Sequence, residues 1–363
     1  MAGFFYLDIV LYLIRRVLYY MFMSDIYNKL LILRTPGIGP VKFNSLIKRF
    51  GNVASAVLSL GPDVAFCDSV KREMDKAAQL GIHYLSDDDA LYPENLRKVK
   101  NHPPVISVRG NLQTLARPMV SIVGTRHATV AGMNFVADLA QAFADSGTVV
   151  VSGMAIGTDT AAHRGALRAQ GNMQTIAVLA GGVDYVWPPE NESLYYQILE
   201  RGAVISEMPV GFVPVATNFV QRNRWVAGLA DKLILGEADL KSGSMTTARF
   251  AIDYGRELWA IPSHPADLRA VGPNSLIRSG DAKLCMGIQD FFKTERFDAN
   301  SEKKLEKFNA ENNLLDALGT NPVSESVLAE VVKKSVSEIK RDLVVLELQG
   351  LVQKVDGGYV RLV

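Results

Sequence analysis

The sequence has few cysteines, little net charge and no long apolar run, and each of these shortages argues against a class of protein. The two cysteines, Cys67 and Cys285, lie far apart and outside any Cys-x-x-Cys. A disulfide framework or a zinc ribbon is therefore disfavoured, and a reducing cytosol fits. The formal net charge of +1 argues against a globally basic nucleic-acid binder, although a local basic pocket stays compatible with it.

The common nucleotide-binding motifs are missing as well. The first expected strand is followed by Gly124-Thr125-Arg126 rather than by G-x-G-x-x-G, and the second ends in Ser152-Gly153 with no acidic residue to hold a ribose. No G-x-x-x-x-G-K-[ST] occurs, so a P-loop ATPase is disfavoured. We therefore expect no cofactor and no metal.

Residues 1–23 are strongly apolar, but Asp8 and the Arg15-Arg16 pair interrupt them. No run approaches the roughly 18 apolar residues that a membrane span needs. An amphipathic surface helix, a membrane-touching anchor and an upstream start codon are the open alternatives. We favour translation that begins at Met23, because a well-formed domain starts just after it. We expect no stable membrane insertion and a cytoplasmic location.

Strand-like runs alternate with helix-compatible stretches over residues 120–292. The runs are apolar throughout, without the alternation typical of a half-exposed sheet, and they are Val120–Val123, Thr148–Val151, Thr175–Leu179, Ala203–Ile205, Lys232–Leu235 and Glu257–Ile261. This pattern predicts an extended Rossmann-like α/β domain with a doubly wound, mostly parallel sheet that is covered on both faces.

Glycines and basic residues follow these strands at the positions where the loops of such a sheet converge. Ligands of open α/β sheets bind outside the carboxyl ends of the strands, and helix N-termini offer unpaired N–H groups to phosphates. We therefore predict one phosphate-binding pocket that includes Gly124, Arg126, Gly153, Gly181, Gly182, Arg222, Arg224, Lys241, Ser242, Gly243 and Ser244.

Several ionisable side chains in the same region are candidates for acid–base chemistry. We interpret His163 as a packed or hydrogen-bonding residue, Asp159 as a helix N-cap and Asp184 as a turn or cap residue rather than a catalytic acid. Glu207 and Glu237 each follow a strand, and they either act as acid–base groups or orient Arg222 and Arg224. No catalytic residue is assigned.

The segments before the sheet read as a helical module and a connector. Residues 24–80 contain short helices with a turn at Gly37-Ile38-Gly39, which resembles a helix-hairpin-helix (SAM-like) module whose turn amides meet a DNA phosphate. A helical module with no role in DNA binding is the alternative. Residues 81–119 are rich in turn-forming residues and are expected to form a connector.

The end of the chain reads as a charged linker and a small domain. Residues 293–309 form the linker, and residues 310–363 predict three helices followed by a hairpin, which is typical of a winged helix. The third helix presents Lys340 and Arg341, which would meet DNA. Docking of a protein is the alternative role.

The motifs together resemble those of the DNA-processing protein A family (DprA, also called Smf). The resemblance covers residues 90–292 and is carried by VSIVGTR (120–126), SGMAIGTDTAAHRGAL (152–167), TIAVLAGGVDYVWPPEN (175–191), ISEMP (205–209), NFVQRNRWVAGLAD (218–231), LILGEADLKSGSMTTARFAIDYGRELWAIP (233–262) and GPNSLIRSGDAKL (272–284). It implies a homodimeric protein that binds single-stranded DNA and helps load RecA recombinase in natural transformation. Carried over by position, the resemblance adds Thr125, Ser152, Asn218 and Asn223 to the predicted pocket, although many relatives have Ser where Thr125 stands.

A phosphoribohydrolase-like enzyme acting on a nucleotide is the alternative function. That related family has P-G-G-x-G-T-x-x-E, whereas this chain has no acid at the end of the corresponding run, Ser242–Arg249. We therefore expect binding rather than hydrolysis, with Arg126, Arg222, Arg224 and Lys241 gripping successive phosphates of one strand. Because these contacts leave the bases largely unread, little sequence preference is expected.

Overall fold

The computed structural model describes residues 24–291, 313–319, 322–348 and 351–362. The expectations for residues 1–23 and for the linker at 293–309 fall outside the described residues. The chain divides into two compact units, Met1–Asp290 and Phe291–Val363. Among the described residues, none of the helices has the length and apolar character that crossing a membrane requires.

A nine-stranded sheet forms the centre of the first unit. Its strand order is β1-β2-β6-β5-β4-β3-β7-β8-β9. The strands from β6 to β9 run parallel, whereas β1 and β2 are antiparallel additions at one edge. The bounds are β1 Ile82–Ser86, β2 Val105–Gly110, β3 Met119–Val123, β4 Val149–Ser152, β5 Thr175–Val178, β6 Ala203–Ser206, β7 Lys232–Leu235, β8 Glu257–Ala260 and β9 Lys283–Leu284. The predicted doubly wound, mostly parallel sheet is confirmed.

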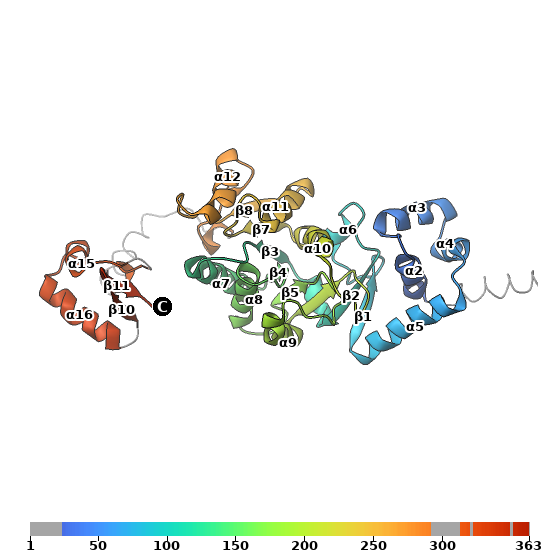
Figure 1. The fold of residues 1–363 in the computed structure, drawn as a ribbon, viewed down its shortest axis with the longest axis horizontal. Helices are drawn as coiled ribbons and strands as arrows, with labels where there is room; N and C mark the ends of the chain where they lie inside the picture. The colour runs from blue at the N-terminus through green and yellow to red at the C-terminus, as the bar shows by residue number, and fades with distance from the viewer. Residues whose placement is uncertain (1–23, 292–312, 320–321, 349–350, 363) are drawn as a thin grey trace, which may run out of the picture. The chain divides into compact units, whose positions relative to one another are not determined.

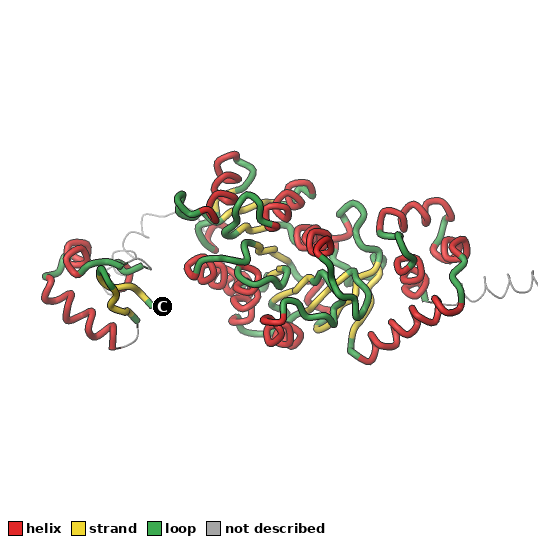
Figure 2. Tube along the Cα trace, viewed as in Figure 1, coloured by secondary structure: helices red, strands yellow, loops and turns green. Residues whose placement is uncertain are grey.

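Helices cover both faces of the sheet, which explains why its central strands are apolar without alternation. Every residue of β3, β4, β5 and β6 is buried. The helices α7 (Val130–Asp145), α8 (Thr158–Arg168) and α9 (Glu192–Arg201) lie on one side, and α10 (Ala216–Leu229), α11 (Gly243–Asp253) and α12 (Val271–Ser279) lie on the other (Figure 1). The strands form the layer between these two sets of helices (Figure 2).

Residues 81–119 belong to the sheet, so the expected connector is wrong. The segment supplies β1 and β2, together with α6 (Glu94–Arg97) and the 3-10 helix η1 (Leu112–Ala116). The two strands are only five and six residues long. Prolines and aspartates occupy the turn between them, and this turn chemistry dominates the composition of the segment.

The structure describes four helices before the sheet, and the first and the last contact its antiparallel edge. The four helices are α2 (Asp25–Arg34), α3 (Pro40–Phe50), α4 (Val53–Leu60) and α5 (Val64–Gln79). The buried Lys29 on α2 donates hydrogen bonds to Ser86, Asp87 and Asp88 at the end of β1. Because removing one partner from such a buried group is costly, this cluster fixes the helices against the sheet.

The second unit has the predicted winged-helix architecture. It contains α14 (Asn313–Asp316), α15 (Glu325–Val332), α16 (Val336–Leu348) and the hairpin β10 (Val352–Val355) to β11 (Gly358–Arg361). Its core includes Leu328, Ile339 and Leu343. Lys340 lies 3.3 Å from Glu325, so the positive charge of the third helix is partly offset at this position.

Candidate nucleic-acid interface

A pocket of about 240 Å³ lies at the carboxyl ends of the parallel strands. It borders the ends of β3 and β4, and β3 has β4 on one side and β7 on the other. The pocket is therefore at the point where the strand order reverses, where open α/β sheets bind ligands. Six of the predicted residues line it, namely Arg126, Gly153, Arg222, Asn223, Gly243 and Ser244.

Arg222 is a fixed cation in the wall of this pocket. Its side chain is only 6% exposed, and Nη1 donates hydrogen bonds to the carbonyl oxygens of Gly153 and Val178. Nε donates to Asn223 Oδ1 at 3.2 Å. Burial lowers the pKa of Arg222 to about 10, which leaves it charged at neutral pH. The guanidinium is thus held in one orientation before any ligand arrives.

Asp159 closes the loop that leads from β4 into α8. Its carboxylate accepts hydrogen bonds from the backbone N–H groups of Gly153 at 3.2 Å and Ala155 at 3.3 Å. The predicted N-cap role is wrong, because Gly157 is the N-cap and Asp159 lies inside the first turn. Gly157 has a φ of +79°, a conformation that an aspartate would rarely adopt. Burial raises the pKa of Asp159, and the charge of Arg222 opposes that shift.

Arg126 is exposed and lies over two aromatic rings. Its guanidinium carbon is 5.3 Å from the centre of Trp187 and 6.0 Å from that of Phe219, and the two rings are 4.7 Å apart. Such rings attract cations and also stack on nucleic-acid bases. The sequence reasoning did not assign Trp187 or Phe219 to the site. Both are 30 residues or more from Arg126 in the chain, so only the fold brings them together.

The N-terminus of α11 forms another side of the pocket. Ser242 is the N-cap, and its Oγ lies 2.6 Å from Ser244 Oγ. Asn223 Nδ2 donates to the carbonyl of Gly243 at 3.4 Å and thereby links α10 to α11. The positive end of the helix dipole therefore faces the pocket. Lys241 is exposed on the preceding loop and does not line the pocket.

The remaining predicted residues shape the loops rather than line this pocket. Thr125 N donates to the carbonyl of Glu237 at 2.6 Å, and Ser152 Oγ donates to that of Ile122 at 2.7 Å. Asn218 Oδ1 accepts from Val215 N at 2.9 Å in the first turn of α10. The three glycines Gly124, Gly181 and Gly182 sit where an added Cβ would approach neighbouring atoms closely.

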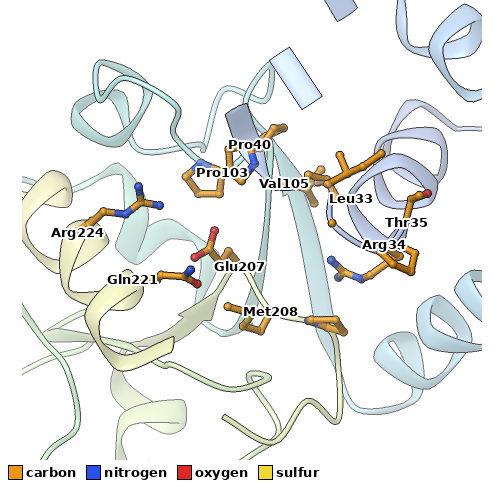
Figure 3. A pocket seen from close by; sticks show the side chains of 16 residues that line it. Leu33, Arg34, Thr35, Pro40, Pro103, Val105, Glu207, Met208, Gln221 and Arg224 are labelled. Atoms are coloured by element: carbon orange, nitrogen blue, oxygen red, sulfur yellow. The ribbon is translucent and has the colours of Figure 1, made fainter. Parts of the chain in front are cut away.

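Arg224 lies on the opposite side of α10 from Arg222, so the prediction that both arginines line one pocket is wrong. An α-helix has 3.6 residues per turn, and residues two apart therefore point about 200° from each other. Arg224 instead lines a second cavity, together with Glu207 and Gln221 (Figure 3). Both arginines lie within α10, which begins at Ala216.

The other acid–base candidates have structural partners. Glu237 accepts hydrogen bonds from Thr129 N at 2.6 Å and from Thr129 Oγ1 at 2.5 Å, at the start of α7. Asp184 accepts from Gly211 N at 2.6 Å and pairs with Lys76 at 3.1 Å. These contacts anchor loops and leave neither carboxylate orienting an arginine of the pocket.

His163 has the packed, hydrogen-bonding role that the sequence predicts. Its side chain is fully buried, and Nδ1 lies 2.7 Å from Thr175 Oγ1. Burial, with a smaller effect of Arg222, lowers its pKa to about 3. The imidazole is therefore neutral at physiological pH and sealed from solvent, which does not suit a general base.

Three family models match three successive parts of the chain. The model described as DNA recombination-mediator protein A matches residues 83–296. A DprA-like N-terminal HHH domain matches residues 24–77, and a DprA winged helix domain matches residues 303–358.

Individual related proteins and solved structures are also similar to this chain. The chain is 32% identical to the Smf protein of Escherichia coli over 77% of each chain. It is 38% identical to the Smf protein of Synechocystis over 57% of this chain and 52% of that protein, about half of that relative's length.

Two solved structures cover most of the described fold. The structure of DNA processing protein A from Streptococcus pneumoniae aligns with a TM-score of 0.63 and 30% identity, covering 74% of this chain and 96% of that one. A Helicobacter pylori structure, whose subject is the single-stranded DNA binding mode of DNA processing protein A, aligns with a TM-score of 0.54 and 32% identity. That alignment covers 59% of this chain and 95% of the Helicobacter chain.

Proposed function

The chain belongs to the DNA recombination-mediator protein A family, and from this premise we propose that it binds single-stranded DNA at the carboxyl edge of its sheet. The pocket there supplies Arg126 and Arg222 as cations and the N-terminus of α11 as a partner for a phosphate. The similarity to the Helicobacter pylori protein, whose single-stranded DNA binding mode is described, supports the same ligand here.

One arrangement carries this proposal. Three features converge on one small pocket: the Arg222 guanidinium held by two carbonyls, the N-terminus of α11, and Arg126 over two aromatic rings. Cations and amides suit the phosphate backbone, and aromatic rings suit unstacked bases. Bases of a duplex are already stacked and paired, so the aromatic pair Trp187 and Phe219 favours a single strand.

The wider role that we propose is recombination mediation. The chain would cover exposed or incoming single strands, help load RecA recombinase and act in natural transformation. A homodimer would align two pockets along one strand. In the proposed site Arg126, Gly153, Arg222, Asn223, Gly243 and Ser244 line the pocket, and the loops around it are formed by Gly124, Thr125, Ser152, Gly181, Gly182, Asn218, Lys241 and Ser242, whereas Arg224 belongs to the neighbouring cavity.

We propose binding rather than catalysis. Asp159, the carboxylate that lines the pocket, is engaged by two backbone N–H groups, and His163 is buried away from it. A phosphoribohydrolase would release free base from a nucleoside monophosphate. Incubating the protein with nucleoside monophosphates and separating the products is therefore expected to show no free base.

The decisive experiment is a titration with single-stranded and double-stranded oligonucleotides at several salt concentrations. We expect tighter binding of the single strand. If about three phosphates are neutralised per protomer, the logarithm of the affinity falls with the logarithm of the salt concentration with a slope of about −2, at roughly −0.7 per contact. Equal affinity for both forms, or no dependence on salt, would contradict the proposal.

A further inference from the structure

A second cavity, of about 350 Å³, lies between the turn at residues 35–40 and the helix α10. Its volume is within the roughly 300–1,000 Å³ typical of small-ligand pockets. Much of its wall is apolar and rigid, formed by Pro36, Pro40, Pro103, Pro104, Met208 and Pro209. Proline rings are apolar and conformationally restricted, so they can pack against the face of a planar ligand with little loss of conformational entropy.

Three polar side chains extend into this cavity from the sheet and from α10. Glu207, Gln221 and Arg224 point toward the same space (Figure 3). Within the part of the chain that the structure describes, no carboxylate lies within 4.0 Å of the Arg224 guanidinium, which lies over the ring of Trp225 at 4.5 Å. A cation and a carboxylate thus border one cavity without pairing.

The other arginine at this cavity is already satisfied. Arg34 donates two hydrogen bonds to the carboxylate of Glu73, at 2.9 and 2.8 Å. Among the described residues, Glu207 has no such paired arginine. Burial raises the pKa of its carboxyl group, and the Trp225 indole and the charge of Arg224 oppose this shift. A ligand that donates hydrogen bonds to Glu207 would favour its ionised form.

We propose that this cavity binds a guanine ring, with Glu207 and Arg224 reading its two edges. Guanine has two adjacent donors, N1–H and the N2 amino group, which match the two oxygens of a carboxylate. Its O6 and N7 are adjacent acceptors, which match the forked donors of arginine. Adenine and cytosine would place a ring-nitrogen acceptor opposite the carboxylate, and thymine offers one N–H between two carbonyls.

The cavity is also within reach of a strand that occupies the first pocket. The helix α10 separates the two sites, with Arg222 on one side and Arg224 on the other, and a helix is about 10–12 Å across with its side chains. Roughly three nucleotides at about 3.4 Å each would span this distance. This route rests on the proposed function, whereas binding of a free guanine nucleotide does not.

The turn between α2 and α3 supports the assignment. Gly37 and Gly39 line the cavity, and Gly39 is the N-cap of α3. Pro36 and Pro40 have no N–H group, and Ile38 N donates to the Thr35 carbonyl at 3.1 Å, so Gly37 and Gly39 are the residues of this turn that could offer an N–H to a phosphate on the guanine nucleoside. The turn of the predicted helix-hairpin-helix therefore borders the same cavity as α10.

The test compares full-length protein binding to oligo(dT) and to strands of the same length that carry one central dG or dA. We expect the dG strand to bind about tenfold tighter than the other two, because a bidentate contact to a base discriminates against the wrong base. The variants Glu207→Gln and Arg224→Gln are expected to lose this preference and to keep the affinity for oligo(dT). Glu200→Gln, an exposed acid on α9, is the matched control and is expected to keep the preference.

The arms of the experiment separate the possible failures. No binding of oligo(dT) would contradict the proposed function, whereas equal binding of dT, dA and dG strands would contradict the guanine site alone. A dG preference that persists in Glu207→Gln would also overturn it. Titration with GMP distinguishes the source of the ring: saturable binding that Glu207→Gln abolishes would support a site that also takes the free nucleotide. Thermal unfolding of each variant confirms that it is folded.

Discussion

The guanidinium of Arg222 occupies the space next to Gly153 that any other residue's side chain would need. An added Cβ at position 153 would lie 2.6 Å from Arg222 Cζ, and Arg222 Nη1 donates a hydrogen bond to the Gly153 carbonyl. A glycine at the end of β4 and an arginine in the middle of α10 therefore determine each other. The proposed phosphate pocket depends on this relationship, because it sets where the buried charge lies.

Replacing Gly153 with alanine is expected to weaken binding of single-stranded DNA by at least tenfold. The new methyl group would displace the Arg222 guanidinium, which two carbonyls now hold in the pocket. Fluorescence anisotropy with a labelled oligonucleotide measures the effect. Gly319→Ala is the control, because nothing lies within 4 Å of its added Cβ. Unchanged affinity in Gly153→Ala would show that the guanidinium position is unimportant.

The two arginines of α10 are expected to differ in their contribution to stability. Arg222→Ala would leave the buried carbonyls of Gly153 and Val178 without their donor, at a cost of about 2–4 kcal/mol in the free energy of unfolding. Arg224→Ala would remove a contact with Trp225 and cost about 1 kcal/mol or less. Urea denaturation of both variants is the measurement, and equal losses would contradict the division of roles.

Arg126 is expected to account for one phosphate contact. Arg126→Gln should make the salt slope of single-strand binding less steep by about 0.7, the value for one contact. Arg117→Gln removes the same charge just before β3, at the opposite end of that strand, and is expected to leave the slope unchanged. Titrations at several salt concentrations provide both slopes. A reduction of the same size in both variants would mean that only net charge matters.

The cluster around Asp87 is expected to make stability depend on pH in two windows. Burial would raise the pKa of Asp87, but hydrogen bonds from His102 and Lys29 hold it at about 2. Its contribution is therefore present above the unfolded pKa of about 3.9 and is lost as the pH falls toward 2. The pKa of His102 is raised, chiefly by its hydrogen bond to Asp87. That contribution is present below the unfolded value of about 6.5 and is lost as the pH rises through the folded value.

Denaturation at a series of pH values tests this expectation. The free energy of unfolding should be highest between about pH 4 and 6.5 and decline on both sides. Asp87→Asn should reduce both declines in the free energy of unfolding. Asp75→Asn, at an exposed position on α5, should leave both declines unchanged. A pH profile of Asp87→Asn that matches the unsubstituted protein would assign the dependence to other groups.

The sheet and the position of the pocket could be predicted from local patterns in the chain. Apolar runs without alternation, such as Val120–Val123, are required where helices cover both faces of a sheet, and loops after parallel strands meet at one edge. The local sequence also favoured a packed role for His163, which follows two alanines in a helical stretch. The sequence pattern did not predict the two short strands in residues 81–119, because turn-forming residues dominate the composition of that segment.

The grouping of side chains into sites could be read only from the packed fold. Arg222 and Arg224 are close in sequence, but the phase of α10 sends them to different cavities. Arg126, Trp187 and Phe219 are distant in sequence, and two loops and the first turn of α10 bring them into contact. Local patterns report burial and turns because these depend on a residue's neighbours in the chain. A site depends on the directions of side chains from separate elements, and these directions exist only once the elements have packed.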